Sequence, residues 1–313
     1  MSGTSASTFA KRSAAAGVVV WLLLLPAVTS DSPETELIHK VVFFAIFVIV
    51  PLCLSLIGAE EDSLYRLVVF AQPVAALLTV AAFVFEMGAL SALLSSAWFV
   101  LNALVGLMGV MRLWSRRIYA PLHELSIDAG LLYLPVAGAW LVVYRYGIQP
   151  FDYGETIVLL TVVHFHFAGF ATPIIAGLSG RVLATRQYPA RLFGVVVFAL
   201  VAAMPLVAAG ITFSPWLGFV GALLLTVGLL LLAVLTIRWV IPAINPLARR
   251  LLLFTGALSS CSAMVLACLY AYSLATKTLI LDIPTMAMTH GLLNAFGFVT
   301  CSLLAWTSFS LKN

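Results

Sequence analysis

Two histidines, His164 and His166, lie within an apolar run that extends over residues 159–171. A charged side chain at the centre of a spanning helix costs about 2.5 to 3.5 kcal/mol on insertion scales, so ionisable residues there usually face a packed interior or a water-filled cavity. On a regular α-helix His166 shares a face with Gly169 and Pro173, whereas His164 points nearly the opposite way. Each ring is therefore a candidate catalyst or a hydrogen-bonding link between helices.

A second polar set lies in the last apolar segment, where His290, Asn294, Gly297 and Cys301 recur at i, i+4, i+7 and i+11. This spacing lays a small and polar seam along one face of a helix. Close helix packing explains Gly297 and Cys301 as well as a site does. His290 and Asn294 are candidate catalytic residues.

Two acids complete the predicted catalytic set. Glu86 lies at one end of the third apolar segment, and Asp128 lies one helical turn beyond Glu124 in the fifth. Either acid is a candidate proton donor or acceptor. The alternative is structural, since acids at helix ends reach the interface or pair with arginines such as Arg116 or Arg117.

Aromatic and amide side chains surround these ionisable groups. Buried carboxylic acids can donate protons and aromatic faces can stabilise cations, which suits acid-base chemistry on a lipophilic substrate. Ordinary bundle packing is the alternative for each aromatic ring. The predicted substrate-lining residues are Trp98, Asn102, Phe170 and Phe298.

We expect no cofactor and no metal ligand. Three histidines and Glu86 could supply ligands for zinc, iron, copper or haem, but their spacing matches no specific metal motif, neither paired histidines on one helix face nor a di-iron Glu-x-x-His pattern. Glycine-rich phosphate loops and nucleotide fingerprints are also missing from the sequence.

The composition defines the class of protein. Of 313 residues 63% are hydrophobic and only 9% are charged, far from the make-up of a soluble domain. The net charge of +4 is spread over short loops, which argues against a nucleic-acid partner. The four cysteines lie apart in apolar segments, so neither a disulfide framework nor a thiolate metal site is expected.

The sequence predicts an all-α, polytopic transmembrane bundle of about ten helices, since about 20 apolar residues cross a bilayer. The first segment follows Lys11 and Arg12 and is either a spanning helix or a cleaved signal peptide, which would leave nine. Residues 1–37 form the predicted N-terminal part and 38–313 a single bundle. The segments are 14–30, 38–58, 66–89, 92–112, 123–144, 156–178, 192–211, 216–240, 250–275 and 286–309.

Basic residues collect in alternate loops, at 112–117, 181–191 and 238–250, together with Lys11, Arg12 and Lys312. The opposite loops carry Asp152, Glu155 and Asp282. By the positive-inside rule both termini are cytoplasmic if the first helix is retained, in the inner membrane of a bacterium.

A weak internal repeat aligns 167–172 with 295–300, across four intervening helices, and sets His166 opposite Asn294. A parallel repeat of 66–178 and 192–309 would result. Chance recurrence of Gly and Phe in an apolar chain is the alternative.

The run 164–170, the later run 289–298, residues 50–52 and residues 124–128 together resemble the YndJ-like family of bacterial membrane proteins, over most of the chain after residue 38. That family has no established biochemical role, so the resemblance indicates a site but no reaction. In size and character the chain is also similar to bacterial membrane-embedded terpenoid cyclases, a likeness of type and not of motif.

Three functions therefore stay open. The favoured one is a membrane-embedded acid-base enzyme that cyclises or isomerises a lipophilic, isoprenoid-like substrate, with membrane lipid around it. The alternatives are a small-solute or proton-coupled transporter and a non-catalytic membrane protein. The sequence sets neither the substrate nor the oligomeric state.

Overall fold

The computed structural model describes residues 5–30, 32–59, 62–116 and 121–307. Over these residues the chain is helical, and ten helical spans are long and apolar enough to cross a membrane. The predicted all-α class and the predicted count of ten spans are thereby confirmed. The chain is a multi-pass membrane protein.

Within the described residues five spans are single α-helices, and the other five change helix type along their length. In chain order the elements are α1 (Ala6–Leu24); α2 (Pro33–Phe44), η1 (Ala45–Ile49) and α3 (Val50–Leu54); α4 (Ser63–Ala81) and η2 (Ala82–Val84); α5 (Ala89–Arg116); α6 (Leu122–Tyr146); η4 (Pro150–Asp152), then α7 (Glu155–His164), η5 (Phe165–Ala171) and α8 (Thr172–Leu183); α9 (Ala190–Phe213); α10 (Pro215–Leu235), η6 (Thr236–Val240) and η7 (Ile241–Ala243); α11 (Leu247–Thr276); and α12 (Ile283–Met286), η8 (Ala287–Gly291), η9 (Leu293–Thr300) and α13 (Cys301–Thr307).

The chain divides into two compact units. Unit 1 comprises residues 1–119 and 128–171, and unit 2 comprises residues 120–127 and 172–313. The fifth and sixth spans therefore contribute to both units. The predicted division into 1–37 and 38–313 remains a prediction.

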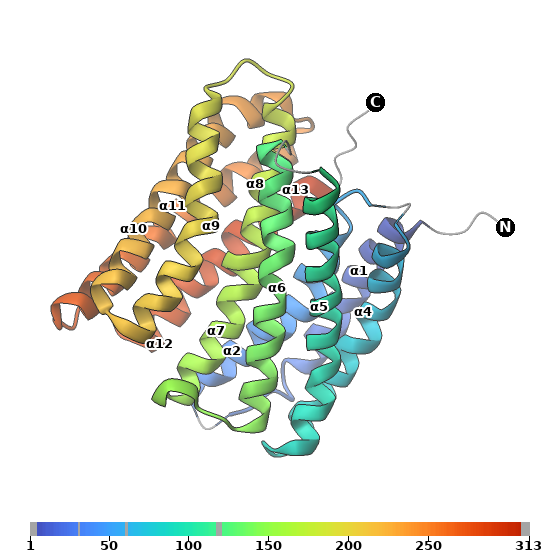
Figure 1. The fold of residues 1–313 in the computed structure, drawn as a ribbon, viewed down its shortest axis with the longest axis vertical. Helices are drawn as coiled ribbons and strands as arrows, with labels where there is room; N and C mark the ends of the chain where they lie inside the picture. Colours follow the sequence, from blue (N-terminus) through green and yellow to red (C-terminus); the bar gives the residue numbers. More distant parts are fainter. Residues whose placement is uncertain (1–4, 31, 60–61, 117–120, 308–313) are drawn as a thin grey trace. The chain divides into compact units, whose positions relative to one another are not determined.

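In unit 1 the second span is the most buried, with 89% of its central window inside the protein. α1 packs on it closely: a Cβ added to Gly17 would lie 2.1 Å from the Phe47 carbonyl oxygen, and the Trp21 indole N–H donates to Lys40 O at 2.8 Å. α1 also packs against α4, which pairs with α5 (Figure 1).

The first helix starts at Ala6, eight residues before the predicted start at 14. The Ser5 side chain caps it by accepting from the Thr8 N–H, and Ala6, Ala10, Ala14 and Gly17 form its buried face. Lys11 and Arg12 lie on the exposed face of the same helix, so two charges do not interrupt it.

In unit 2 α9, α10 and α11 pack as successive neighbours (Figure 1). Glycine allows the first of these contacts, since a Cβ on Gly210 would lie 2.1 Å from the Cα of Gly218. The last span packs on α11 through η9 and α13. α8 packs on the first turns of α6, where a Cβ on Gly177 would lie 2.5 Å from the His123 carbonyl oxygen.

In the part of the chain that the structure describes, five stretches are π-helices, namely η1, η5, η6, η8 and η9. Such stretches are rare, usually short, and frequently found at functional sites. Both copies of the sequence motif at 167–172 and 295–300 overlap π-helical segments. The four-helix repeat itself stays a prediction, but the histidine helix is not the regular α-helix on which the predicted faces were based.

Candidate functional site

His166 is the buried ionisable residue at the middle of the sixth span. Its side chain is 0% exposed. Nδ1 lies 2.8 Å from the Val162 carbonyl oxygen, which only accepts, so Nδ1 carries the hydrogen. The Trp98 indole N–H donates to Nε2 at 3.0 Å. Both nitrogens are thus satisfied, and the imidazole is held as one neutral tautomer whose basic nitrogen is Nε2.

His164 has different surroundings, although it lies only two residues away. Its Nδ1 donates to the Leu160 carbonyl oxygen at 2.7 Å, and its side chain is exposed. One ring therefore points into the core of unit 1 and the other points out of it. His166 is the better candidate for chemistry within unit 1.

Asn102 lies one helical turn from Trp98 on α5 and is 0% exposed. Among the described residues neither its Oδ1 nor its Nδ2 has a hydrogen-bond partner. Gly138 of α6 makes room for the amide, since a Cβ there would lie 2.9 Å from Asn102 Nδ2. A buried polar group without a partner costs about 1 to 3 kcal/mol, so this amide marks a place that suits a hydrogen-bonding ligand.

The structure thus brings three predicted site residues, Trp98, Asn102 and His166, into one region of unit 1. His166 lies 11 residues from the start of α7, which corresponds to about 16 Å at 1.5 Å per residue. That is about half of a 30 Å hydrocarbon core. Phe170, also predicted, is fully buried one turn further along η5.

A polar stripe on α5 leads to this region from one end only. Ser91, Ser95, Trp98 and Asn102 are all buried on one face of the helix. Beyond Asn102 the same face continues as Gly106 and Gly109, whose added Cβ atoms would lie 2.5 Å from Pro135 Cγ and 2.9 Å from Leu131 Cβ. The half of this face beyond Asn102 is closed by tight apolar packing.

Asp128 lies at that closed end, where it forms ion pairs. Its carboxylate is 1% exposed and accepts from Arg112 Nε at 2.6 Å and from Arg116 at 3.0 Å. We call this the basic end of unit 1. The arrangement matches the structural alternative for Asp128.

Glu86 lies at the opposite end of unit 1, in the exposed turn between η2 and α5. Glu34 and Glu155 begin α2 and α7 at the same end, which we call the acidic end. Glu86 therefore belongs to the surface of unit 1 and not to its buried site.

His290 and Asn294 form a separate, half-buried pair in unit 2. His290 Nδ1 donates to the Ala263 carbonyl oxygen at 2.8 Å, and Asn294 Nδ2 donates to the His290 carbonyl oxygen at 3.0 Å. Gly297 lies against α11, with an added Cβ only 2.4 Å from Ser259 Oγ. Close packing therefore accounts for Gly297, while His290 links the last two spans and Asn294 bonds His290 within its own span.

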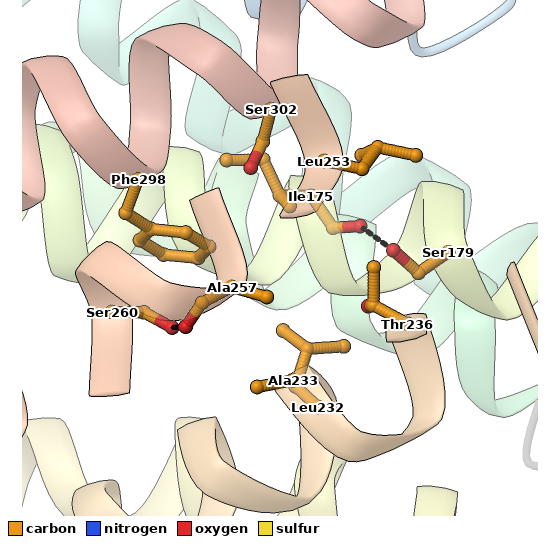
Figure 2. A pocket seen from close by; sticks show the side chains of 10 residues that line it. All are labelled: Ile175, Ser179, Leu232, Ala233, Thr236, Leu253, Ala257, Ser260, Phe298 and Ser302. Carbon is orange, nitrogen blue, oxygen red and sulfur yellow. Dashed lines mark hydrogen bonds between the residues drawn. The ribbon is translucent and has the colours of Figure 1, made fainter. Parts of the chain in front are cut away.

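Unit 2 also contains a small cavity lined by residues of α8, α10, η6, α11, η9 and α13 (Figure 2). Its volume is about 10 Å³, enough for roughly one water molecule. Ser179 and Ser260 donate their hydroxyl protons to carbonyl oxygens of their own helices, at 3.0 and 2.9 Å. The cavity has no room for a lipid. Its lining comprises Ile175, Ser179, Leu232, Ala233, Thr236, Leu253, Ala257, Ser260, Phe298 and Ser302.

A polar cluster at the acidic end of unit 1 was not predicted from the sequence. His39 Nε2 lies 2.6 Å from the Tyr144 hydroxyl, which donates to Glu155 at 3.2 Å. The neighbouring Arg145 binds Ser91 Oγ at 2.7 Å and the Phe85 carbonyl oxygen at 2.6 Å. His39 lies inside the second predicted segment, so it carries the same signal as His164, an ionisable ring within an apolar span.

Among the described residues no three His, Cys, Asp or Glu side chains gather as a metal-ligand set. His166 uses both ring nitrogens, one on the Val162 carbonyl oxygen and one on the Trp98 indole, and His39 Nε2 is hydrogen-bonded to the Tyr144 hydroxyl. The predicted absence of a metal remains a prediction.

The chain matches the sequence model described as YndJ-like protein over residues 40–298. It is 26% identical over 295 residues to the uncharacterized membrane protein YndJ of Bacillus subtilis (strain 168), an alignment that covers 93% of this chain and 52% of that relative. The chain thus spans about half the length of the curated relative it matches. No solved structure matches it. The family model covers well over half of the sequence, so the chain belongs to the YndJ-like family.

Proposed function

We propose that the chain is a membrane-embedded acid-base enzyme that acts on a lipophilic substrate at His166. The observation that carries the proposal is the unpartnered amide of Asn102, fully buried one turn from the Trp98–His166 hydrogen bond. A polar group of the substrate would bind that amide. His166 Nε2 would be the reacting base.

Local hydrogen bonding suits His166 to this role. The Val162 carbonyl oxygen fixes the proton on Nδ1, which leaves the Nε2 lone pair for proton abstraction. In the present form that lone pair accepts from Trp98. Substrate entry therefore requires Trp98 to release Nε2, after which the indole ring can line the apolar part of the substrate.

A neutral imidazole favours isomerisation over proton-initiated cyclisation. In an isomerisation the base removes a proton from one carbon and the resulting imidazolium returns it to another, so protons balance and no further reactant is needed. Initiating a cyclisation needs a proton donor, and the candidate acids Asp128 and Glu86 are ion-paired and surface-exposed respectively. We therefore favour double-bond migration in an isoprenoid-like lipid.

The membrane orientation is part of the proposal. The basic end of unit 1 would face the cytoplasm of a bacterium and the acidic end the outside, since positive charge is retained inside. Single cysteines placed at exposed Asp152, near the acidic end of unit 1, and at exposed Ser115, near its basic end, test this with a membrane-impermeant maleimide. Intact cells should label the first and not the second, and the reverse labelling would contradict the orientation.

The reaction is tested by comparing lipids in three strains that lack the chromosomal gene and carry wild type, His166→Gln or the control Trp114→Phe. An isomerisation conserves mass, so the signature is a pair of lipids of equal mass and different retention time. We expect the substrate isomer to accumulate with His166→Gln and the product isomer to form with wild type and the control.

Glutamine retains an acceptor for the Trp98 N–H but cannot act as a base at neutral pH, so the variant separates catalysis from packing. Equal lipid profiles in all three strains, with His166→Gln present at the wild-type level in membranes, would refute the proposal.

A transporter is the second candidate, and the π-helical interruptions of the second, sixth and last spans favour it. Transporter sites commonly lie where spanning helices are interrupted near mid-membrane. Lipid profiles that do not change, together with a proton-dependent flux in proteoliposomes that is lost in His166→Gln, would support this candidate instead.

A further inference from the structure

A chain of side-chain hydrogen bonds at the acidic end of unit 1 joins an exposed acid to a buried imidazole. Glu155 is exposed at the start of α7. Its carboxylate accepts from the Tyr144 hydroxyl at 3.2 Å, and the Tyr144 oxygen lies 2.6 Å from His39 Nε2. Tyr144 is 2% exposed and His39 is 8% exposed.

We propose that Glu155, Tyr144 and His39 form a proton-transfer chain between water at the acidic end and the interior of unit 1. This inference does not depend on the proposed function of His166, because the hydrogen bonds that join the three residues do not include Trp98 or His166. The species that moves along these three side chains is the proton.

Each step conserves protons. A proton on the His39 imidazolium leaves from Nε2 to the Tyr144 oxygen, Tyr144 passes its own hydroxyl proton along its existing hydrogen bond to the Glu155 carboxylate, and Glu155 releases it to water. Tyr144 ends unchanged, and one proton has moved from the imidazole to water. The 2.6 Å separation is within the range in which a side chain transfers protons to a positioned partner.

The surroundings hold these groups in place. His39 packs edge-on against the Phe83 ring, at 5.1 Å between centroids, and that ring also lies under the Arg145 guanidinium at 4.6 Å. Arg145 is fixed by the backbone oxygens of Ala82 and Phe85 and by Ser91. The cluster therefore has few alternative arrangements.

The charged and titratable groups around His39 come from three helices. Arg145 and Tyr144 of α6 and Glu155 of α7 face it from the neighbouring elements. On its own helix Glu36 and Lys40 form an ion pair with each other. Glu155 is thus the acid that links the buried ring to the exposed surface.

The test is hydrogen-deuterium exchange of the His39 ring N–H, followed by solid-state NMR of 15N-histidine-labelled protein in lipid bilayers. Positioned proton donors accelerate transfer by about 10² to 10⁴-fold, so Tyr144→Phe should slow the exchange by at least about 100-fold. Tyr133→Phe, a half-buried tyrosine on the same helix, should leave it unchanged. An unchanged His39 rate in Tyr144→Phe would overturn the proposal.

A second variant covers the case in which Tyr144→Phe disturbs packing, which would appear as faster exchange at the His166 ring as well. Glu155→Gln keeps both Tyr144 and the length of the side chain while it removes the carboxylate. We expect slowed exchange at His39 with no change at His166. Wild-type exchange at His39 in Glu155→Gln would overturn the proposal.

Discussion

The hydrogen bond between Trp98 and His166 can be measured by replacing Trp98 with phenylalanine. The substitution keeps an aromatic ring but removes the N–H that donates to Nε2 at 3.0 Å. A fully buried acceptor without its donor costs about 1 to 3 kcal/mol. We therefore expect Trp98→Phe to lower the free energy of unfolding by that amount, apart from the loss of ring volume.

A double-mutant cycle separates the hydrogen bond from the loss of volume. Hydrogen bonds between transmembrane helices average about 0.6 kcal/mol in such cycles and reach about 1.7 kcal/mol. We expect the coupling between Trp98→Phe and His166→Leu to lie in this range, and near its upper end because both partners are 0% exposed. Reversible unfolding in mixed micelles of a mild detergent and SDS gives the free energies of unfolding of the wild type, the two single variants and the double variant.

The matched control is Trp114→Phe, the same substitution on the same helix at a tryptophan that is 84% exposed. It should change stability by no more than about 0.5 kcal/mol, as surface substitutions do. A coupling of zero between Trp98 and His166, or equal losses for the two tryptophan variants, would refute the assigned hydrogen bond.

Three further predictions concern packing and charge. Gly177→Ala should destabilise unit 2 by about 1 to 3 kcal/mol, because the new Cβ would lie 2.5 Å from the His123 carbonyl oxygen. Gly194→Ala, where the nearest atom to the new Cβ is at 3.7 Å, should instead stabilise the protein by up to about 1 kcal/mol through helix propensity. Equal effects of the two variants in chemical unfolding would contradict the packing. Asp128→Asn should lower the free energy of unfolding by up to about 3 kcal/mol, which is the lower end of the range for a broken buried ion pair because the Arg116 side chain is 30% exposed. Asp152→Asn, the exposed control, should change it little, and equal losses for the two variants in the same unfolding assay would contradict the prediction. Hydrogen bonds from the Thr285 hydroxyl and backbone amide lower the pKa of the exposed Asp282 carboxyl. The stabilisation from this helix cap is therefore complete above the usual aspartate pKa and is lost as the pH falls through the lowered pKa. A Thr285 amide resonance that stays constant through that pH range would contradict the cap.

The spans were predictable because a polytopic chain must satisfy its backbone hydrogen bonds within helices while apolar side chains face lipid. Segment boundaries agree closely for most spans. The early start of α1 was missed because Lys11 and Arg12 read as flanking charges, although the small residues on the opposite face make that turn a packing surface.

The candidate site was predictable in part. Trp98, Asn102 and His166 were selected individually from residue type and depth, but their proximity depends on how α5, α6 and η5 pack. Gly138 leaves the space for the Asn102 amide, and no local pattern around Gly138 indicates which side chain fills it. The π-helix at η5 begins directly after His164, and the two rings still point out of and into the core of unit 1, as regular helical spacing predicted.

The bond between His39 and Tyr144 joins residues that are 105 positions apart in the sequence. Each residue also has an ordinary local explanation, His39 as a polar residue in the first turns of a span and Tyr144 as an interfacial aromatic. Only the packing of α2 against the end of α6 and the start of α7 reveals them as a cluster. No pattern in a single sequence indicates that two residues 105 positions apart form a hydrogen bond.

The most direct test of the central claim is conversion by the purified protein in lipid nanodiscs that contain a lipid extract of the gene-deletion strain. We predict that wild type converts one accumulated lipid into an isomer of equal mass, and that His166→Gln does not, while Trp114→Phe converts it at the wild-type rate. Conversion by His166→Gln at the wild-type rate, or no conversion by any of the three proteins, would contradict the assignment of His166 as the base.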